Sequence, residues 1–249
     1  MTDKAPTSNK ARTSDMTNTP GTSTTPSAPS APLIDFSRPA DEVAPLLLGA
    51  ILRVGPVAVE LTEVEAYLGE LDAASHAAKG PTPRASVMFG PPQRLYVYVS
   101  YGIHRAGNIV CSPNGTASAV LLRGGRVVMG EDIAMQRRLD MRLSTRSATR
   151  GNTRAGTRSA IAPEMLARGP GNLGAALGLD LHLNGQPFSQ GSGTGLAGGV
   201  ELIPAPRRVD YVTGPRIGIS KNTDAQLRFW IPGDPTVSSP RGRAARGRA

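Results

Sequence analysis

Cysteine is nearly missing from this chain of 249 residues, which contains a single one, Cys111. One cysteine excludes an internal disulfide and any zinc site built from several cysteines. Cys111 lies in the apolar run "NIVCS", which indicates a buried thiol rather than a nucleophile. A chain without disulfides suits the reducing interior of a cell, so we expect an intracellular protein.

Long apolar runs are missing too. No stretch of the sequence approaches the roughly 20 apolar residues of a membrane helix, so we expect no membrane partner. Residues 1–32 contain no apolar segment typical of a secretory signal and are rich in serine, threonine and proline. This composition is typical of a disordered arm, and we expect the folded domain to span residues 33–238.

Acidic residues are absent from two arginine-bearing segments, an insert at about residues 142–160 and the tail at 239–249. Their arginines account for the whole basic excess of the chain, which has 28 lysines and arginines against 19 aspartates and glutamates. The composition predicts two flexible segments that attract phosphates without reading a base sequence. A solvated linker would carry the same charge. The arginines are Arg142, Arg146, Arg150, Arg154, Arg158, Arg241, Arg243, Arg246 and Arg248.

Aromatic residues make up only 4% of the chain, yet "LYVYVSYGIH" at 95–104 holds three of its five tyrosines. Strand alternation places Tyr96 and Tyr98 on one face, where Tyr96 is expected to be an ordinary strand residue. Tyr98 could line a pocket with Tyr67. Tyr101 comes at the predicted turn beside Gly102 and is expected to be exposed, where an aromatic ring can insert between stacked bases.

Carboxylates follow the apolar positions of the strand predicted over residues 55–67. Strict alternation continues the face of Leu61 to Glu63, Glu65 and Tyr67, so the apolar face would end in carboxylates. We expect Glu63 to point into water. For Glu65 the pattern fits two interpretations equally well: a side chain that points into water, or a partly desolvated carboxylate that acts as a base.

Histidine is scarce as well, with three in the chain. His76 lies in a polar loop, where a surface residue is the more common case. No second histidine follows it at metal-binding spacing, so we expect no metal site.

The remaining pattern predicts strands mixed with helices, without the regular alternation of a doubly wound sheet. We expect helices over residues 39–52 and 128–139, and two helical pieces within 161–179. Further strands are expected at 95–101, 107–112, 116–124, 200–205, 216–220 and 227–231, with the first two meeting near Gly102 as a hairpin. The "GTGLAG" sequence at 193–198 lacks the flanking strand and helix of a dinucleotide site and is set aside.

Several ordered motifs together resemble one family. "EVEAYLG" at 63–69, "ASHAAKGPTPR" at 74–84, "MFGPPQRLYVYVSYGIH" at 88–104, "AVLLRGG" at 119–125 and "ARGPGNLGAALGL" at 167–179 are similar to the alkyladenine (3-methyladenine, 3-methylpurine) DNA glycosylases. The resemblance covers roughly residues 33–240. It implies an α+β fold, a single mixed domain with a curved, mainly antiparallel sheet like that of formyltransferase C-terminal domains. Helices would surround the sheet, and a β-hairpin would protrude.

The resemblance also implies roles for individual residues. Glu65 corresponds to the general base that activates water, and Asn172 stands where a lysine is common in the family. The other residues form a pocket for the flipped base and contacts to the DNA around it. The resemblance assigns base binding to Tyr67, His76, Tyr98 and Asn108, of which Asn108 would help to exclude guanine. It assigns DNA binding to Tyr101, as the wedge that fills the gap in the duplex, and to Arg123, which would lie near a phosphate.

The function implied is DNA base-excision repair. The enzyme would flip alkylated or deaminated purines out of double-stranded DNA and hydrolyse the N-glycosidic bond, leaving an abasic site without lyase activity. Neither a metal nor an organic cofactor is implied, and we expect a monomer in the bacterial cytoplasm, at the nucleoid. The alternatives are a catalytically inactive nucleic-acid-binding protein of the same fold, a formyltransferase-like domain acting on RNA, and a hydrolase of a small substrate using Glu63 and Glu65.

Overall fold

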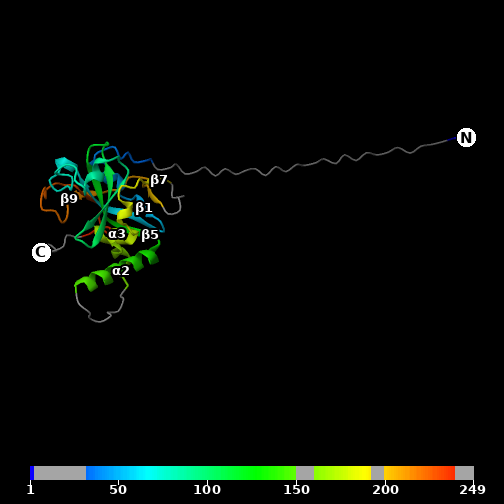
Figure 1. Cartoon of the computed structure of the whole chain (residues 1–249). Coiled ribbons are helices and arrows are strands. Elements are labelled where there is room, and N and C mark those ends of the chain that lie inside the picture. The colour runs from blue at the N-terminus through cyan, green and yellow to red at the C-terminus, as the bar shows by residue number, and fades with distance from the viewer. Residues whose placement is uncertain (3–31, 150–159, 192–198, 239–249) are drawn as a thin grey trace, which may run out of the picture.

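The computed structural model describes residues 1–2, 32–149, 160–191 and 199–238 (Figure 1). The strands of these segments form one ten-stranded sheet with the main order β3-β4-β5-β2-β1-β8-β7. Outside this order, β6 pairs with β5, β10 pairs with β2, and β9 pairs with β10. Every pairing is antiparallel except that of β7 with β8. The predicted class, one mixed α+β domain with a curled, mainly antiparallel sheet, is confirmed. The strands are β1 (Ile51–Val54), β2 (Val57–Tyr67), β3 (Leu95–Ser100), β4 (His104–Cys111), β5 (Ser118–Met129), β6 (Ala167–Arg168), β7 (Ser189–Gln190), β8 (Val200–Ile203), β9 (Val212–Gly214) and β10 (Arg228–Trp230).

Three α-helices accompany the sheet in the described segments. Helix α1 (Ala40–Leu47) packs on β2 and β5, α3 (Pro170–Leu177) packs on β4 and β5, and α2 (Glu131–Thr149) packs on α3 (Figure 1). Short 3-10 turns occur at η1 (Gly69–Leu71), η2 (Ser86–Phe89), η3 (Pro163–Met165) and η4 (Leu181–Leu183). Within these segments no helix combines the length and the apolar character that crossing a membrane requires.

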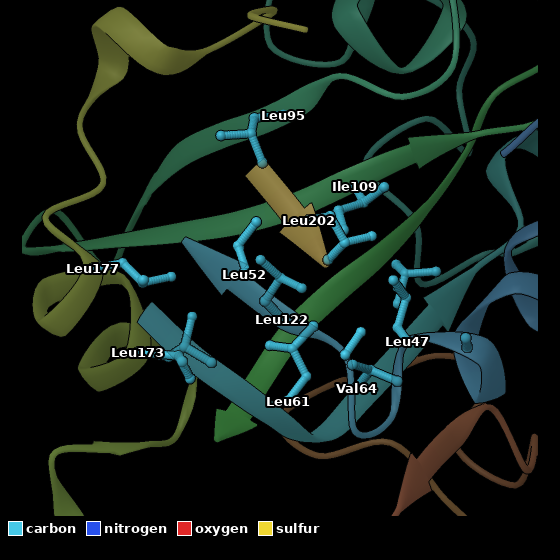
Figure 2. Packing of buried hydrophobic residues seen from close by; sticks show 14 of the residues in the cluster. Leu47, Leu52, Leu61, Val64, Leu95, Ile109, Leu122, Leu173, Leu177 and Leu202 are labelled. Carbon is cyan, nitrogen blue, oxygen red and sulfur yellow. The ribbon is translucent and has the colours of Figure 1, made fainter. Parts of the chain in front are cut away.

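The sheet has a covered apolar face on each side of β3, β4 and β5. Leu95 and Ile109 belong to the main core, together with leucines of both α1 and α3 (Figure 2). The neighbouring residues Tyr96 and Val110 belong to a second, smaller cluster under the loop that follows β2. The predicted alternation of "LYVYVSY" is therefore confirmed, as is the burial of Cys111 in the main core.

Strand β2 changes, partway along, which of its residues face the main core. Val59 and Leu61 lie in this core, but so does Val64, so the inward positions switch from odd to even numbers. The register between β2 and β5 shifts on both sides of Glu63, which marks a β-bulge. An inserted residue turns every later side chain to the opposite face. Strict alternation therefore fails beyond Leu61, because the bulge points Glu63 and Glu65 away from the main core.

Two glycines of β5 accommodate this bulge. Gly124 is the register partner of Glu63, and a Cβ atom there would lie 2.9 Å from the carbonyl oxygen of Thr236. A Cβ atom on Gly125 would lie 2.5 Å from the carbonyl oxygen of Glu60. Glycine inside a strand is typical of such a close approach of two backbones. The two glycines that end the motif "AVLLRGG" are therefore required by packing, because a side chain at either position would collide with a neighbouring backbone.

Two helix predictions were too long or of the wrong type. The helix predicted over 39–52 ends at Leu47, because Gly49 takes φ +77° and the chain re-enters the sheet as β1. The first piece predicted within 161–179 is a single 3-10 turn followed by β6, and only the second is an α-helix. The residues predicted as a strand at 216–220 form bends, while the short strands β1, β7 and β9 were not predicted.

The arginine-rich insert is not flexible throughout. Helix α2 begins at Glu131, two residues after the end of β5, and runs to Thr149, so residues 142–149 are helical and the prediction is wrong for them. Arg142, Leu143, Arg146 and Ala148 of this stretch are good helix formers, and they outweighed its serines and threonines in extending the helix. The rest of the insert, the motif at 193–198, and almost all of the predicted arm and tail lie outside the described residues.

The fit between β5 and the bulge can be tested with Gly125→Ala. The added methyl group would overlap the backbone of β2, so we expect the free energy of unfolding to fall by roughly 1–3 kcal/mol in chemical denaturation. Gly90→Ala is the matched control, because Gly90 has a φ of −80° and its nearest contact for a Cβ is 3.3 Å away. Equal stability of the two variants would contradict the close approach.

Candidate active site

A broad groove lies on the sheet face opposite the main core. It has a volume of about 2270 Å³ and is bounded by the loop after β2, the β3–β4 connection and the segment 215–221. Pockets for small ligands measure roughly 300–1,000 Å³, so this groove suits a larger partner. Six of the seven predicted site residues line it: Tyr67, His76, Tyr98, Tyr101, Asn108 and Arg123.

The seventh, Glu65, lies directly behind the groove wall and is fully buried. Its carboxylate accepts hydrogen bonds from the Tyr67 hydroxyl at 3.0 Å and the Ile217 N–H at 2.8 Å, and Arg123 Nη1 lies 3.3 Å away. Burial raises the pKa of Glu65, and these three partners oppose that shift. A desolvated carboxylate of raised pKa is a stronger base than an exposed one.

Glu63 is the clearest error of the sequence prediction. It was expected to point into water, yet it is fully buried and accepts hydrogen bonds from two arginines, Arg123 at 3.1 Å and Arg228 at 2.6 Å. The Ser238 N–H and hydroxyl also donate to it, at 2.6 and 3.0 Å. The bulge is the cause, because it turns Glu63 toward β10 and the C-terminal segment.

The side wall of the groove consists of aromatic rings. Tyr96 and Tyr98 lie with ring centroids 5.4 Å apart, and His76 stands edge-on to Tyr98 at 4.6 Å. The Nδ1 atom of His76 is 2.9 Å from the Tyr96 hydroxyl, which gives this buried tyrosine its polar partner. Burial lowers the pKa of His76 to about 4, helped by the nearby Arg84 charge, so the imidazole is neutral at pH 7.

The Tyr67 ring contacts a buried ion pair that the sequence did not predict. The guanidinium of Arg216 lies 4.4 Å from the centre of the Tyr67 ring and forms two hydrogen bonds with Asp72, at 2.5 and 2.8 Å. Asn222 adds a third hydrogen bond to Asp72. An isolated arginine in an apolar pattern such as "RIGIS" or "LRFWI" is the signal that could have indicated a buried ion pair.

The remaining predicted residues differ in exposure. Tyr101 is 86% exposed at the turn between β3 and β4, where it and Gly102 both have positive φ, at 50° and 71°. A positive φ is rare for a bulky side chain and indicates local strain. Asn108 is buried and donates to the Tyr96 carbonyl oxygen at 3.0 Å. Asn172 donates to the Arg168 carbonyl oxygen at 2.6 Å.

Comparison with known proteins identifies the family of the chain. The profile of the family described as "Methylpurine-DNA glycosylase (MPG)" matches residues 34–235. The chain belongs to the methylpurine-DNA glycosylase family. Its predicted function as a DNA glycosylase of base-excision repair, a hydrolase, is thereby confirmed, and the catalytically inactive alternative gains no support.

Bacterial relatives of this glycosylase cover most of the chain. A protein of Corynebacterium jeikeium is 58% identical over 219 residues, which are 86% of this chain and 94% of that protein. A protein of Cutibacterium acnes is 55% identical over 210 residues, which are 84% of this chain and 100% of that protein. Each carries the name "Putative 3-methyladenine DNA glycosylase".

Metal-ligand side chains are not clustered in the described part of this glycosylase. None of its aspartate, glutamate, histidine and cysteine residues there form a group of three that could hold a metal ion.

Asp72→Ala should show how far the groove depends on the ion pair that contacts the Tyr67 ring. Removing one partner leaves the Arg216 charge buried, and such a loss destabilises a protein by roughly 3–5 kcal/mol. Chemical denaturation measures this value. The exposed pair of Glu42 with Arg38 provides the control, because Glu42→Ala should change stability little. Similar losses for both variants would contradict the importance of the buried pair.

Acid should separate wild type from Asp72→Ala in a second way. Burial raises the pKa of Asp72, but hydrogen bonds from Arg216, Asn222 and the Ala74 N–H outweigh it and bring the pKa from 3.8 to about 2. A lowered pKa stabilises the folded state above pH 4, and this contribution is lost as the pH falls from about 4 to 2. The free energy of unfolding of Asp72→Ala should therefore fall less than that of the wild type between about pH 4 and 2. Chemical denaturation at each pH measures this difference.

Proposed function

We propose that the groove receives a damaged purine flipped out of double-stranded DNA and that Glu65 catalyses its hydrolytic release. The observation that carries this proposal is the position of Glu65, buried directly behind a wall of Tyr67 and Arg123. The wall opens to a groove large enough for DNA. A flipped base in this groove would bring its sugar next to a carboxylate of raised pKa.

Base flipping needs a group that fills the vacated space in the duplex. We assign this role to Tyr101, whose ring is 86% exposed at a tight turn. We propose that the β3–β4 connection protrudes into the DNA, so that Tyr101 enters the base stack while Tyr98, three residues earlier, stays in the groove. The likeness of the sheet to formyltransferase C-terminal domains also remains a prediction.

The flipped base would stack against the rings of Tyr67, Tyr98 and His76. Stacking on aromatic rings favours a flat base, and a base made cationic by alkylation gains from the electron-rich faces of tyrosine. A neutral His76 is compatible with such a cation, since an imidazolium would repel it. Asn108, buried at the floor of the groove, is proposed to exclude guanine by contact with its 2-amino group.

The chemical step is hydrolysis. Water would reach Glu65 from the groove between Tyr67 and Arg123, and the carboxylate would take its proton as the water oxygen bonds to C1′. The N-glycosidic bond breaks, and its electron pair leaves with the purine. Because the nucleophile is water, the product is an abasic site in an intact strand. The nitrogen of Arg123 that faces neither Glu63 nor Glu65 is proposed to reach a phosphate of the flipped nucleotide.

The substrate class and the setting follow from the relatives. Their names specify 3-methyladenine, so we propose alkylated purines, 3-methyladenine among them, and deaminated purines as the substrates. The relatives come from bacteria, which supports action in a bacterial cytoplasm, on the nucleoid. We propose that the protein works as a monomer.

Base release from lesion-containing duplexes tests the proposal directly. We expect the wild-type protein to release at least one of 3-methyladenine, 7-methylguanine, hypoxanthine and ethenoadenine, and to leave strands that break only on alkaline treatment. We expect Glu65→Gln to bind the same duplex but to release base at least 100-fold more slowly, because the general base is lost.

The control for Glu65→Gln lies on the same strand. Glu60 forms a partly exposed pair with Arg126 outside the groove, so Glu60→Gln should leave release unchanged. Undiminished release by Glu65→Gln would remove this residue from the mechanism.

The wedge is tested by Tyr101→Ser, with Tyr101→Phe as the variant that keeps the ring. Loss of base stacking costs roughly 1–3 kcal/mol, so the serine variant should bind an ethenoadenine duplex roughly 5- to 100-fold more weakly. It should also produce less of the fluorescence of the unstacked lesion. If serine and phenylalanine variants bind alike, Tyr101 is not a wedge.

A further inference from the structure

Glu63 and Glu65 are linked through one guanidinium group. Arg123 donates from Nε to Glu63 at 3.1 Å and places Nη1 3.3 Å from Glu65. The guanidinium is planar and rigid, so a partner that holds Nε also determines where Nη1 lies. Glu63 therefore controls the position of the charge beside Glu65, although Glu63 itself does not line the groove.

Glu63 is itself firmly held. Arg228 donates to it at 2.6 Å and also to the Ser238 carbonyl oxygen at 2.7 Å, while its guanidinium lies over the Trp230 ring. The Ser238 hydroxyl is within hydrogen-bond distance of both Glu63 and Arg123, at 3.0 and 3.2 Å. These contacts come from β10 and the C-terminal segment, so two elements distant in sequence orient the carboxylate.

We propose that Glu63 is a positioning residue for base excision, which holds Arg123 and shares its charge so that Glu65 keeps the strength of base that the reaction needs. This inference rests on the proposed role of Glu65 as the general base.

The charges of the cluster balance only when all four members are present. Two carboxylates, Glu63 and Glu65, face two guanidinium groups, Arg123 and Arg228. If Glu63 becomes neutral, the Arg123 charge acts on Glu65 alone and its pKa should fall. If Arg228 becomes neutral, the negative charge of Glu63 is less compensated and the pKa of Glu65 should rise.

Other groups that face Glu65 stay the same in both variants. Tyr67 comes from its own strand, Tyr98 from β3 and Arg216 from the segment after β9, and each interacts electrostatically with Glu65. A difference between the variants would therefore report on the link from Glu63 through Arg123.

The test is the pH dependence of single-turnover excision from a duplex with one neutral lesion, hypoxanthine or ethenoadenine, with enzyme in excess. Glu65 is active when deprotonated, so the rate falls as the pH drops through its pKa. We expect the midpoint of this acid limb to move down by about 1 pH unit in Glu63→Gln and up in Arg228→Gln. The plateau rate of Glu63→Gln should also fall, since Glu65 becomes a weaker base.

Two further variants separate charge from structure. Ser238→Ala disturbs the same cluster but keeps every charge, so its midpoint should match that of wild type even if its rate is lower. Arg228→Lys keeps the charge and should return the midpoint toward wild type. Circular dichroism and melting temperature check that each variant is folded, and Arg228→Gln carries the test if Glu63→Gln does not fold.

The outcomes distinguish this inference from the proposed function. If Glu65→Gln is inactive but no midpoint moves, or both variants move in the same direction, Glu63 is only structural and the proposed function stands. If Glu65→Gln still releases base, the proposed function fails and the inference with it. Opposite shifts, with Glu65→Gln inactive, support both.

Discussion

The β-bulge in β2 is the feature on which the candidate active site depends. Without it, Glu63 and Glu65 would continue the inward positions of Leu61 and enter the main core beneath the helices. The bulge turns them to the opposite face, where the groove lies. Such bulges are known next to active sites because one inserted residue re-aims every later side chain. Here it converts a continuous apolar strand into one whose end presents two carboxylates on the groove side of the sheet.

Burying two carboxylates beside each other costs free energy, and positively charged side chains from the surrounding strands offset this cost. Arg123 from β5 and Arg228 from β10 neutralise Glu63, while Arg123 and the Ile217 N–H support Glu65. A buried charge needs both a partner and hydrogen bonds for its remaining lone pairs. The C-terminal segment, through Ser238, supplies part of these bonds. The carboxylate cluster is thus assembled from three strands, the segment after β9 and the C-terminal segment rather than from one motif.

Much of the site could be predicted because the local pattern was regular where it mattered. Alternation in "LYVYVSY" correctly separated Tyr96 and Tyr98 from the main core, and the turn at Gly102 correctly suggested an exposed Tyr101. Alternation failed at Glu63, because a bulge leaves no local signal in its own strand and depends on Gly124 and Gly125 across the sheet. The Arg216–Asp72 pair was missed because its members are distant in sequence.

The sequence by itself determined the family, most of the strands and six of the residues that line the groove. These depend on residue type and on short-range order, which a single chain displays directly. The tertiary structure alone decided which way Glu63 and Glu65 point, which arginines neutralise them, and that Glu65 lies behind the wall rather than on it. The physical reason is that burial and charge pairing arise between elements far apart in the chain, so no local pattern specifies them.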